Sequence, residues 1–419
     1  MRNARCTAIT IAALALTASL IAQDDLRDKV TRRDGKVLTG RIVEPFATEE
    51  LLLLQGGKRV RLARGDVAEL DLVGDRVREF FARRFRHQNS PRALRFLVDW
   101  ATTAGLPGLA RAQAMAIALE TDDAAMHEFL GNKQGSNGWL WRHEGHWVTR
   151  AQLDEALAKA PLRVVGERFA MRCDAGLATG INALLDLEYL GVVWFDRFGK
   201  DLPLKEVLQP IEVMTFRNVD AFPKWGFRPR PYYEPPPHAD LARTFYAGPN
   251  PNRPEMLFFL GTEGLLYRTL IGEGDRQNSR ERVCPWVEVG FGMFFEHTMQ
   301  GPPGFASPGP LRAQDLEALR ALGRGYRLTH LLHLPMYASF YMLDDTQTAI
   351  NWSAATMFVA WLLRDDNQPK TREAFLTFVR MALVERQGDS SSAFDRIMGQ
   401  RVEVMEEPWR EWLKKEAGY

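Results

Sequence analysis

The chain has few cysteines, almost no net charge and a single long apolar run, and each shortage excludes a class of protein. Its 419 residues include three cysteines, too few for the disulfide frameworks that hold small secreted domains together. Lys and Arg number 54 and Asp and Glu 53, a formal charge of +1, which favours neither nucleic acid nor an anionic membrane as a partner. Beyond residue 22, no segment has the pattern of a membrane-spanning helix.

The first 22 residues have the pattern of a secretory signal peptide. Arg2 and Arg5 form a positively charged start, residues 6–22 are apolar, and the small residue Ala22 precedes a polar segment. The apolar run is shorter than the roughly 20 residues that a spanning helix prefers, which favours export with cleavage over an uncleaved anchor. The pattern predicts a protein in the periplasm, at the cell envelope or outside the cell.

Two cysteines remain after such a cleavage, Cys173 and Cys284. An exported chain with an even number of cysteines can form a disulfide, and two buried thiols are the alternative. A bond between them would join the start of an α+β region to the segment before Trp286.

Residues 26–73 consist of short runs with strand character, separated by the turn pairs Asp34-Gly35 and Gly56-Gly57. Four or five short strands in so few residues predict a small β-barrel of the SH3-like or Sm-like kind. No aromatic groove is visible in the pattern, so a spacer or docking module is the favoured role.

Residues 75–160 are predicted to be helical, with a β-hairpin inside the region. Apolar residues recur at three- and four-residue spacing up to residue 131, which resembles a tetratricopeptide-like helical pair. Residues 138–149 alternate around Glu144-Gly145 and predict the hairpin. Its histidines, His143 and His146, have no third ligand nearby, which favours exposed side chains over a metal site.

Residues 162–419 have an α+β pattern. A strand or strand pair at 162–173 precedes a long amphipathic helix at 176–199, a strand at 210–222, a Pro-rich extended loop at 223–254 and a strand candidate at 256–261. An apolar helix is expected to begin near Leu265, and the remainder is predicted to be helical. We therefore expect an α+β protein with a short mixed sheet in this region.

The segment 265–295 has the outline of a zinc-peptidase active site without its ligands: an apolar helix, a polar loop, then Pro285-Trp286 and a second helix. The order of elements over 162–419 resembles a family of exported bacterial proteins with a domain of unknown function and a gluzincin-like peptidase fold. Pro285-Trp286-Val287 is similar to the P-W-L opening of that family's second helix. Gly290 is similar to the glycine after the third ligand, and Phe294-Phe295 to an aromatic pair.

The resemblance places side chains that cannot bind zinc at the positions of the metal chemistry. Arg268 and Gly272 stand at the two histidines, Thr269 at the catalytic glutamate and Val289 at the third ligand, and H-E-x-x-H occurs nowhere in the chain. Catalytic zinc takes three protein ligands and activates a water. A conventional zinc site is therefore not expected.

A shifted register places Thr262, Glu263 and Leu266 at the helix positions, which keeps one Glu but supplies no His. Other polar residues surround the expected cleft: Glu273, Glu288, Glu296 and His297. Two carboxylates could form an acid/base pair, but carboxylates at solvated helix ends are the favoured interpretation. No G-x-S-x-G nucleophile motif is present.

Arg268 suggests a different use for the cleft. A guanidinium can hold a carboxylate or phosphate through paired hydrogen bonds, so a peptide end could be bound without being cut. A salt bridge to a neighbouring Glu is the favoured alternative.

The sequence thus predicts an exported, non-catalytic, peptidase-like protein that binds or scaffolds at the cell envelope. We expect no catalytic residue, no metal and no cofactor, and a protein or peptide partner rather than nucleic acid or a membrane. The alternative is a divergent metal-dependent hydrolase with unconventional ligands, which would require zinc.

The side chains around the expected cleft should fill it. Trp286, Phe291, Phe294 and Phe295 are expected in the core, with Leu266, Leu270 and Val289 on the floor of the cleft.

Overall fold

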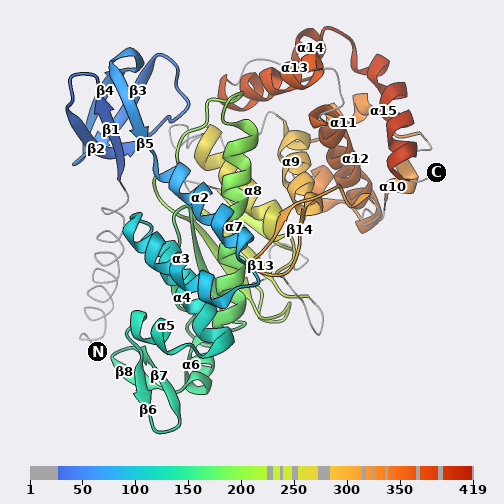
Figure 1. Cartoon of the computed structure of the whole chain (residues 1–419). Coiled ribbons are helices and arrows are strands. Elements are labelled where there is room, and N and C mark those ends of the chain that lie inside the picture. The colour runs from blue at the N-terminus through green and yellow to red at the C-terminus, as the bar shows by residue number, and fades with distance from the viewer. Residues whose placement is uncertain are drawn as a thin grey trace, which may run out of the picture. The chain divides into compact units, whose positions relative to one another are not determined.

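The protein is mixed α and β, as predicted, in the computed structural model (Figure 1). The structure describes residues 27–223, 230–235, 239–247, 253–271, 284–313, 318–322, 325–335, 338–364, 369–385 and 390–417. The chain divides into two compact units, residues 1–149 and 150–419. The predicted signal peptide at 1–22 and the polar loop at 272–283 lie outside the described residues.

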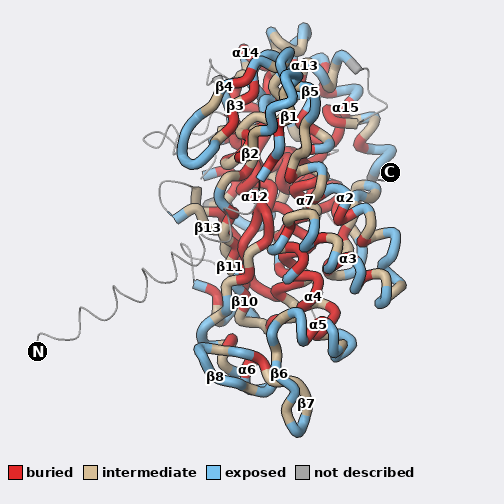
Figure 2. The backbone as a smooth tube through the Cα atoms, turned by 60° about the vertical axis from the view of Figure 1, so that its left-hand side comes forward, coloured by how far each residue is buried: buried red, intermediate tan, exposed pale blue. Residues whose placement is uncertain are grey.

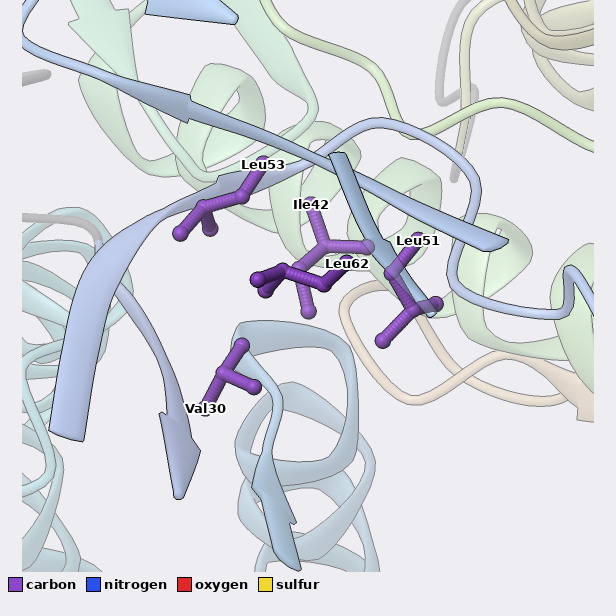
Figure 3. Close-up of a cluster of buried hydrophobic side chains, with 5 residues drawn as sticks. All are labelled: Val30, Ile42, Leu51, Leu53 and Leu62. Carbon is purple, nitrogen blue, oxygen red and sulfur yellow. The ribbon is translucent and has the colours of Figure 1, made fainter. Parts of the chain in front are cut away.

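The first unit opens with a five-stranded antiparallel sheet in the order β4-β3-β2-β1-β5. Its strands are β1 (Asp28–Arg32), β2 (Val37–Ile42), β3 (Glu50–Gln55), β4 (Lys58–Ala63) and β5 (Val67–Asp71). Because side chains alternate between the two faces of a strand, one face gathers a small apolar core of five residues. Figure 3 shows these five side chains together: Val30, Ile42, Leu51, Leu53 and Leu62.

The short strands predicted over 26–73 are present, but their sheet does not close into the predicted barrel. β4 and β5 are the edges of the sheet, and over residues 27–71 they are not hydrogen-bonded to each other. The short helix η1 (Arg64–Asp66) carries the chain from one edge to the other. Alternation identifies strands and their inner face, whereas closure depends on the tilt and shear of the sheet, which the pattern does not encode.

Four helices follow, as the three- and four-residue spacing predicted: α2 (Val73–Arg86), α3 (Pro91–Thr103), α4 (Pro107–Thr121) and α5 (Ala124–Phe129). Ser90 caps α3, because its hydroxyl accepts a hydrogen bond from Ala93 N at 3.4 Å. The buried Asp28 carboxylate accepts hydrogen bonds from Ile42 N at 2.6 Å and from Val73 N at 2.7 Å. It thereby ties the start of α2 to the sheet.

The predicted hairpin is present and is part of a three-stranded sheet of β6 (Lys133–Gly135), β7 (Gly138–His143) and β8 (His146–Val148). The buried ring of His127, in α5, stacks on Trp139 with centroids 4.6 Å apart. The ring Nε2 lies 3.0 Å from Asp122 Oδ1, and Nδ1 lies 2.8 Å from Asn132 Nδ2. The stacking on Trp139 packs the hairpin against α5, and the two polar contacts fix the orientation of the His127 ring.

The second unit begins with α6 (Arg150–Leu157) and contains a mixed sheet in the order β12-β13-β11-β10-β9. The strands are β9 (Arg163–Val165), β10 (Phe169–Cys173), β11 (Ile211–Phe216), β12 (Tyr232–Glu234) and β13 (Leu241–Phe245). β10, β11 and β13 are parallel, and the edge strands β9 and β12 are antiparallel to their neighbours. The long helix α7 (Leu177–Phe198) connects β10 to β11.

The strand pair, the long helix and the strand at 210–222 were predicted correctly. The Pro-rich segment is not only a loop, since it contributes β12 and β13.

The strand predicted at 256–261 is wrong. This segment forms α8 (Leu257–Leu265), which continues into a π-helical turn, η2 (Leu266–Ile271). A short, uniformly apolar run has no period with which to distinguish a buried strand from a buried helix.

The rest of the second unit is largely helical, as predicted, with one two-stranded ribbon of β14 (Met299–Gln300) and β15 (Ser307–Pro308). Its helices are α9 (Pro285–Thr298), α10 (Leu319–Leu322), α11 (Leu328–Leu332), η4 (Ala338–Met342), α12 (Asp345–Leu363), α13 (Pro369–Arg380), η5 (Met381–Glu385), α14 (Ser390–Met398) and α15 (Val402–Ala417). Most residues of α7 and α12 are buried (Figure 2). These two helices run through the core of this unit.

Candidate functional site

The segment that resembles a metal-binding helix is one buried helical rod made of α8 and η2. Every residue of α8 is buried, and the helix contacts α7, α9 and the strands β11, β12 and β13. Gly261 and Gly264 allow this close packing, because an added Cβ would lie 2.5 Å from Leu187 Cδ2 or 2.8 Å from Ile211 Cγ2. The rod is an interior element of the fold.

The second helix of the resemblance, α9, packs tightly between α8 and α12. A Cβ added at Gly290 would lie 2.4 Å from Val359 Cγ2, and one at Gly292 would lie 2.5 Å from Phe259 Cδ2. The four aromatic residues predicted for the core are buried there: Trp286, Phe291, Phe294 and Phe295. The glycines let three helices approach closely, which leaves little space between them for a substrate.

Arg268, at the position of the first histidine, is engaged with the mixed sheet. Its Nη2 lies 2.9 Å from Asp240 Oδ2 and donates to the carbonyl oxygen of Gln209 at 3.5 Å. The other carboxylate oxygen of Asp240 accepts a hydrogen bond from the buried Tyr233 hydroxyl. The favoured salt bridge is present, but its partner is Asp240 rather than a neighbouring Glu, and the Arg268 side chain is only 9% exposed.

Thr269 and Val289, at the positions of the catalytic glutamate and the third ligand, are both fully buried. The Thr269 hydroxyl donates to the Leu265 carbonyl oxygen at 2.7 Å and accepts from Trp194 Nε1 at 3.2 Å. Val289 has no donor atom. As predicted, the apolar side chains of the expected cleft floor are buried as well: Leu266, Leu270 and Val289.

The shifted register also leads to core positions. The Thr262 hydroxyl donates to the carbonyl oxygen of Phe258 at 2.7 Å. Glu263 is 2% exposed and Leu266 is fully buried. This register therefore offers one enclosed carboxylate and no nitrogen ligand.

Glu296 serves as the cap of a different helix. Its Oε2 accepts hydrogen bonds from Phe258 N at 2.9 Å and Phe259 N at 3.0 Å, at the start of α8, where Met256 supplies no side-chain cap. Burial raises the pKa of the Glu296 carboxyl to about 7, and the two backbone hydrogen bonds oppose that rise. Glu296 thus holds α8 against α9 and is not at a solvated helix end.

The other candidates do not form a shared site with Glu296 in the part of the chain that the structure describes. Glu288, in the first turn of α9, is 1% exposed, and His297, in the last turn, is 8% exposed. The interpretation of Glu288 as a solvated residue was therefore wrong, and Glu296 is half-buried rather than fully solvated. Gly272 and Glu273 lie outside the described residues.

No three His, Cys, Asp or Glu side chains within the described ranges are grouped so that they could hold a metal ion. The donor types at the described degenerate positions are a guanidinium, a hydroxyl and an alkyl group, and only the hydroxyl has a lone pair to offer. The residues present therefore do not fit a catalytic zinc.

Two buried carboxylates on α7 were missed in the sequence, although each interrupts an apolar helix. Glu188 Oε1 accepts hydrogen bonds from Arg168 N and Phe169 N, both at 2.8 Å. Burial raises the pKa of its carboxyl to about 7, against the effect of these bonds. Asp186 Oδ2 accepts from Arg253 Nε at 2.7 Å and its Oδ1 from Ala306 N at 2.9 Å. Both carboxylates fasten loops to α7.

Cys173 and Cys284 are buried thiols and are not joined in a disulfide. Cys173 ends β10 and lines a small pocket between α6, β10 and the start of α7, whereas Cys284 precedes α9. Burial raises the pKa of the Cys173 thiol, which keeps it protonated and poorly nucleophilic. Of the two alternatives that the sequence left open, the structure shows two buried thiols, since an even number of cysteines specifies no proximity.

The chain matches no protein-family model and no curated protein sequence.

Among the described helices, none combines the length and apolar character needed to cross a bilayer.

Proposed function

We propose that the chain is an exported, non-catalytic, peptidase-like protein that binds or scaffolds at the cell envelope. The observation that carries the proposal is the enclosure of the described degenerate positions. Arg268 is paired with Asp240, Thr269 is hydrogen-bonded to Trp194, and Val289 is buried.

The chemistry of peptide hydrolysis supports the same conclusion. A zinc peptidase lowers the pKa of a metal-bound water and needs an open coordination position beside the substrate. Here an arginine occupies the first ligand position, and α8, α9 and α12 pack through glycines. A substrate would have to separate these helices before it could reach any polar group between them.

The gluzincin-like framework over 162–419 is part of the proposal. It is supported by the succession of a strand pair, a long helix, further strands, the α8–η2 rod and α9. Export is supported by the charged, apolar and small-residue segments of residues 1–22. A framework of this kind without an open active site suits a protein whose function is to bind partners through its surface.

The decisive experiment measures zinc content and peptide turnover on protein purified without an affinity tag. We expect far less than one equivalent of zinc by mass spectrometry and no turnover of fluorogenic peptides above buffer, while a known zinc peptidase assayed in parallel is active. One equivalent of zinc together with turnover abolished by a chelator would instead establish the divergent hydrolase.

Export needs a separate assay, because it does not depend on the site. Residues 1–30 fused to alkaline phosphatase should give active enzyme outside the bacterial cytoplasm. Arg2→Glu with Arg5→Glu should reduce that activity, since the positive start is required for export.

A further inference from the structure

We infer that β4 is a docking edge for an extended segment of a partner protein in which carboxylate and apolar side chains alternate. β4 is a six-residue edge strand that pairs only with β3 within the described residues. An edge strand presents backbone N–H and C=O groups that a further strand can pair with. The proposed docking edge lies in the first unit, so its test does not depend on the function proposed for the second unit.

The two faces of β4 differ in chemistry. Val60 and Leu62 point toward the core of the sheet shown in Figure 3, and Val60 is only half-buried. Arg59 and Arg61 alternate with them and point to the outer face, where both are exposed. A strand added beside β4 would therefore meet apolar side chains on one face and guanidinium groups on the other.

Acidic side chains of the sheet compensate little of the positive charge of Arg59 and Arg61. Arg61 Nη1 lies 3.3 Å from Glu50 Oε2, but the two side chains are 76% and 51% exposed, and such surface pairs contribute little. Arg59 has no ion-pair partner among the described residues. Directly opposite residues in paired strands have Cβ atoms about 4.5–5.5 Å apart, so carboxylates two residues apart on an added strand would face both arginines.

Two half-buried leucines of the neighbouring strand β3, Leu52 and Leu54, lie on the same outer face of the sheet as the arginines of β4. Leu54 pairs with Arg59 on one side and Arg41 on the other, and Leu52 pairs with Arg61. Neither leucine belongs to the apolar core of the sheet. Long acidic side chains of a partner could pack their methylene groups beside these leucines while their carboxylates reach the arginines.

A second copy of this chain fits the edge less well than a separate partner. A β4–β4 pairing would oppose arginine with arginine. The other edge strand, β5, carries Glu69 and Asp71, but Asp71 is already 3.3 Å from Arg76 Nε and 3.6 Å from Lys29 Nζ. A copy would thus bring one unengaged carboxylate to two arginines, so we assign the edge to a different protein.

The test uses the full chain and a fluorescein-labelled peptide of sequence Ser-Glu-Val-Glu-Val-Glu-Ser. We expect saturable binding that weakens between 50 and 300 mM NaCl, and at least tenfold weaker binding for the Arg59→Ala/Arg61→Ala variant. The matched control is Arg86→Ala/Arg92→Ala, which removes the same charge from exposed helix positions and should change the affinity less than twofold. Replacing Glu by Lys in the peptide should abolish binding.

A second measurement distinguishes strand addition from charge attraction alone. Hydrogen exchange should slow at residues 58–63 on peptide binding, and peptide with N-methylated valines should not bind. Equal loss of affinity in the control variant, protection elsewhere in the chain, tight competition by single-stranded DNA, or binding of the N-methylated peptide would each overturn the inference. Concentration-dependent dimerisation abolished by Arg59→Ala/Arg61→Ala would overturn it in favour of a second copy.

Discussion

Charged side chains around α8 and α9 in the second unit are enclosed, whereas those along β4 in the first unit stand in solvent. Glu296 accepts two backbone hydrogen bonds and Arg268 is held by Asp240. Arg59 and Arg61 are both exposed. Of these two arginines, only Arg61 has an ion-pair partner among the described residues, Glu50, and both side chains of that pair are exposed to solvent. Similar groups therefore stabilise the fold in one unit and remain open to solvent in the other.

The largest effect is expected where the enclosed helices touch most closely, in Gly290→Ala. An added Cβ would lie 2.4 Å from Val359 Cγ2 and 2.7 Å from the carbonyl oxygen of Ala355. We expect the free energy of unfolding to fall by about 2–3 kcal/mol, because overpacking outweighs the gain in helix propensity. Denaturant unfolding measures this change.

Gly65→Ala is the control for that substitution, since an added Cβ there meets nothing within 4 Å. It should change the free energy of unfolding by less than about 0.5 kcal/mol. Equal effects of the two substitutions would contradict a tightly packed helix core.

Removal of Arg268 should be the next largest effect. Arg268→Ala leaves the partly buried Asp240 carboxylate without its cation, which should lower the free energy of unfolding by about 2 kcal/mol. In a double-mutant cycle with Asp240→Asn, we expect a coupling energy of at least about 1 kcal/mol. A coupling energy near zero would mean that Arg268 and Asp240 do not stabilise each other, and Arg268 would then be available to bind a ligand.

The two carboxyl groups with raised pKa values, Glu188 and Glu296, should make stability depend on pH in a direction opposite to that of salt-bridged acids. The pKa of Glu188 and that of Glu296 are about 7 in the fold, against 4.5 for an ordinary Glu. Between these values the folded protein holds protons that the unfolded chain has released. Its stability is therefore greatest below about pH 4.5 with respect to these groups, falls as the pH rises to about 7, and then levels off.

The measurement compares the wild type with Glu188→Gln and Glu296→Gln between pH 5 and 8. Each substitution should remove about 1–3 kcal/mol of the pH-dependent change, because the amide cannot ionise. Parallel pH profiles for wild type and variants would show that these carboxylates are not the cause.

The smallest effect on stability is expected at the exposed edge. Arg59→Ala/Arg61→Ala should change the free energy of unfolding by less than about 0.5 kcal/mol, since one side chain is unpaired among the described residues and the other makes an exposed pair. A large loss in thermal unfolding experiments would mean that these arginines stabilise the sheet, and the contrast between the two units would disappear.

Where the sequence carries a clear period, it predicted the structure well. The three- and four-residue spacing over 75–131 predicted α2 to α5, and Glu144-Gly145 predicted the turn between β7 and β8. The prediction failed for residues 256–261, because Leu257–Leu260 are apolar throughout and fit either a strand or a helix. The strands of the predicted barrel were identified correctly, but the sheet does not close, because strand alternation says nothing about whether the edges meet.

The candidate site shows the same limit. The absence of an H-E-x-x-H motif was visible in the sequence, but the use of Glu296 as the cap of α8 was not, because Glu296 and Phe258 are 38 positions apart. Glu188 is visible in the sequence as a charged residue within an apolar helix. Its hydrogen-bond donors, Arg168 N and Phe169 N, could not be predicted from the sequence.

The residue types and their spacing were enough to identify most segments with strand or helix character and the absence of an H-E-x-x-H motif, because both are properties of single residues and their order. Tertiary structure alone decided that Arg268 meets Asp240, that Glu296 caps another helix and that β4 is left at an edge. The physical reason is that charge pairing, burial and strand pairing depend on distances between residues remote in the chain, and only the folded packing sets those distances.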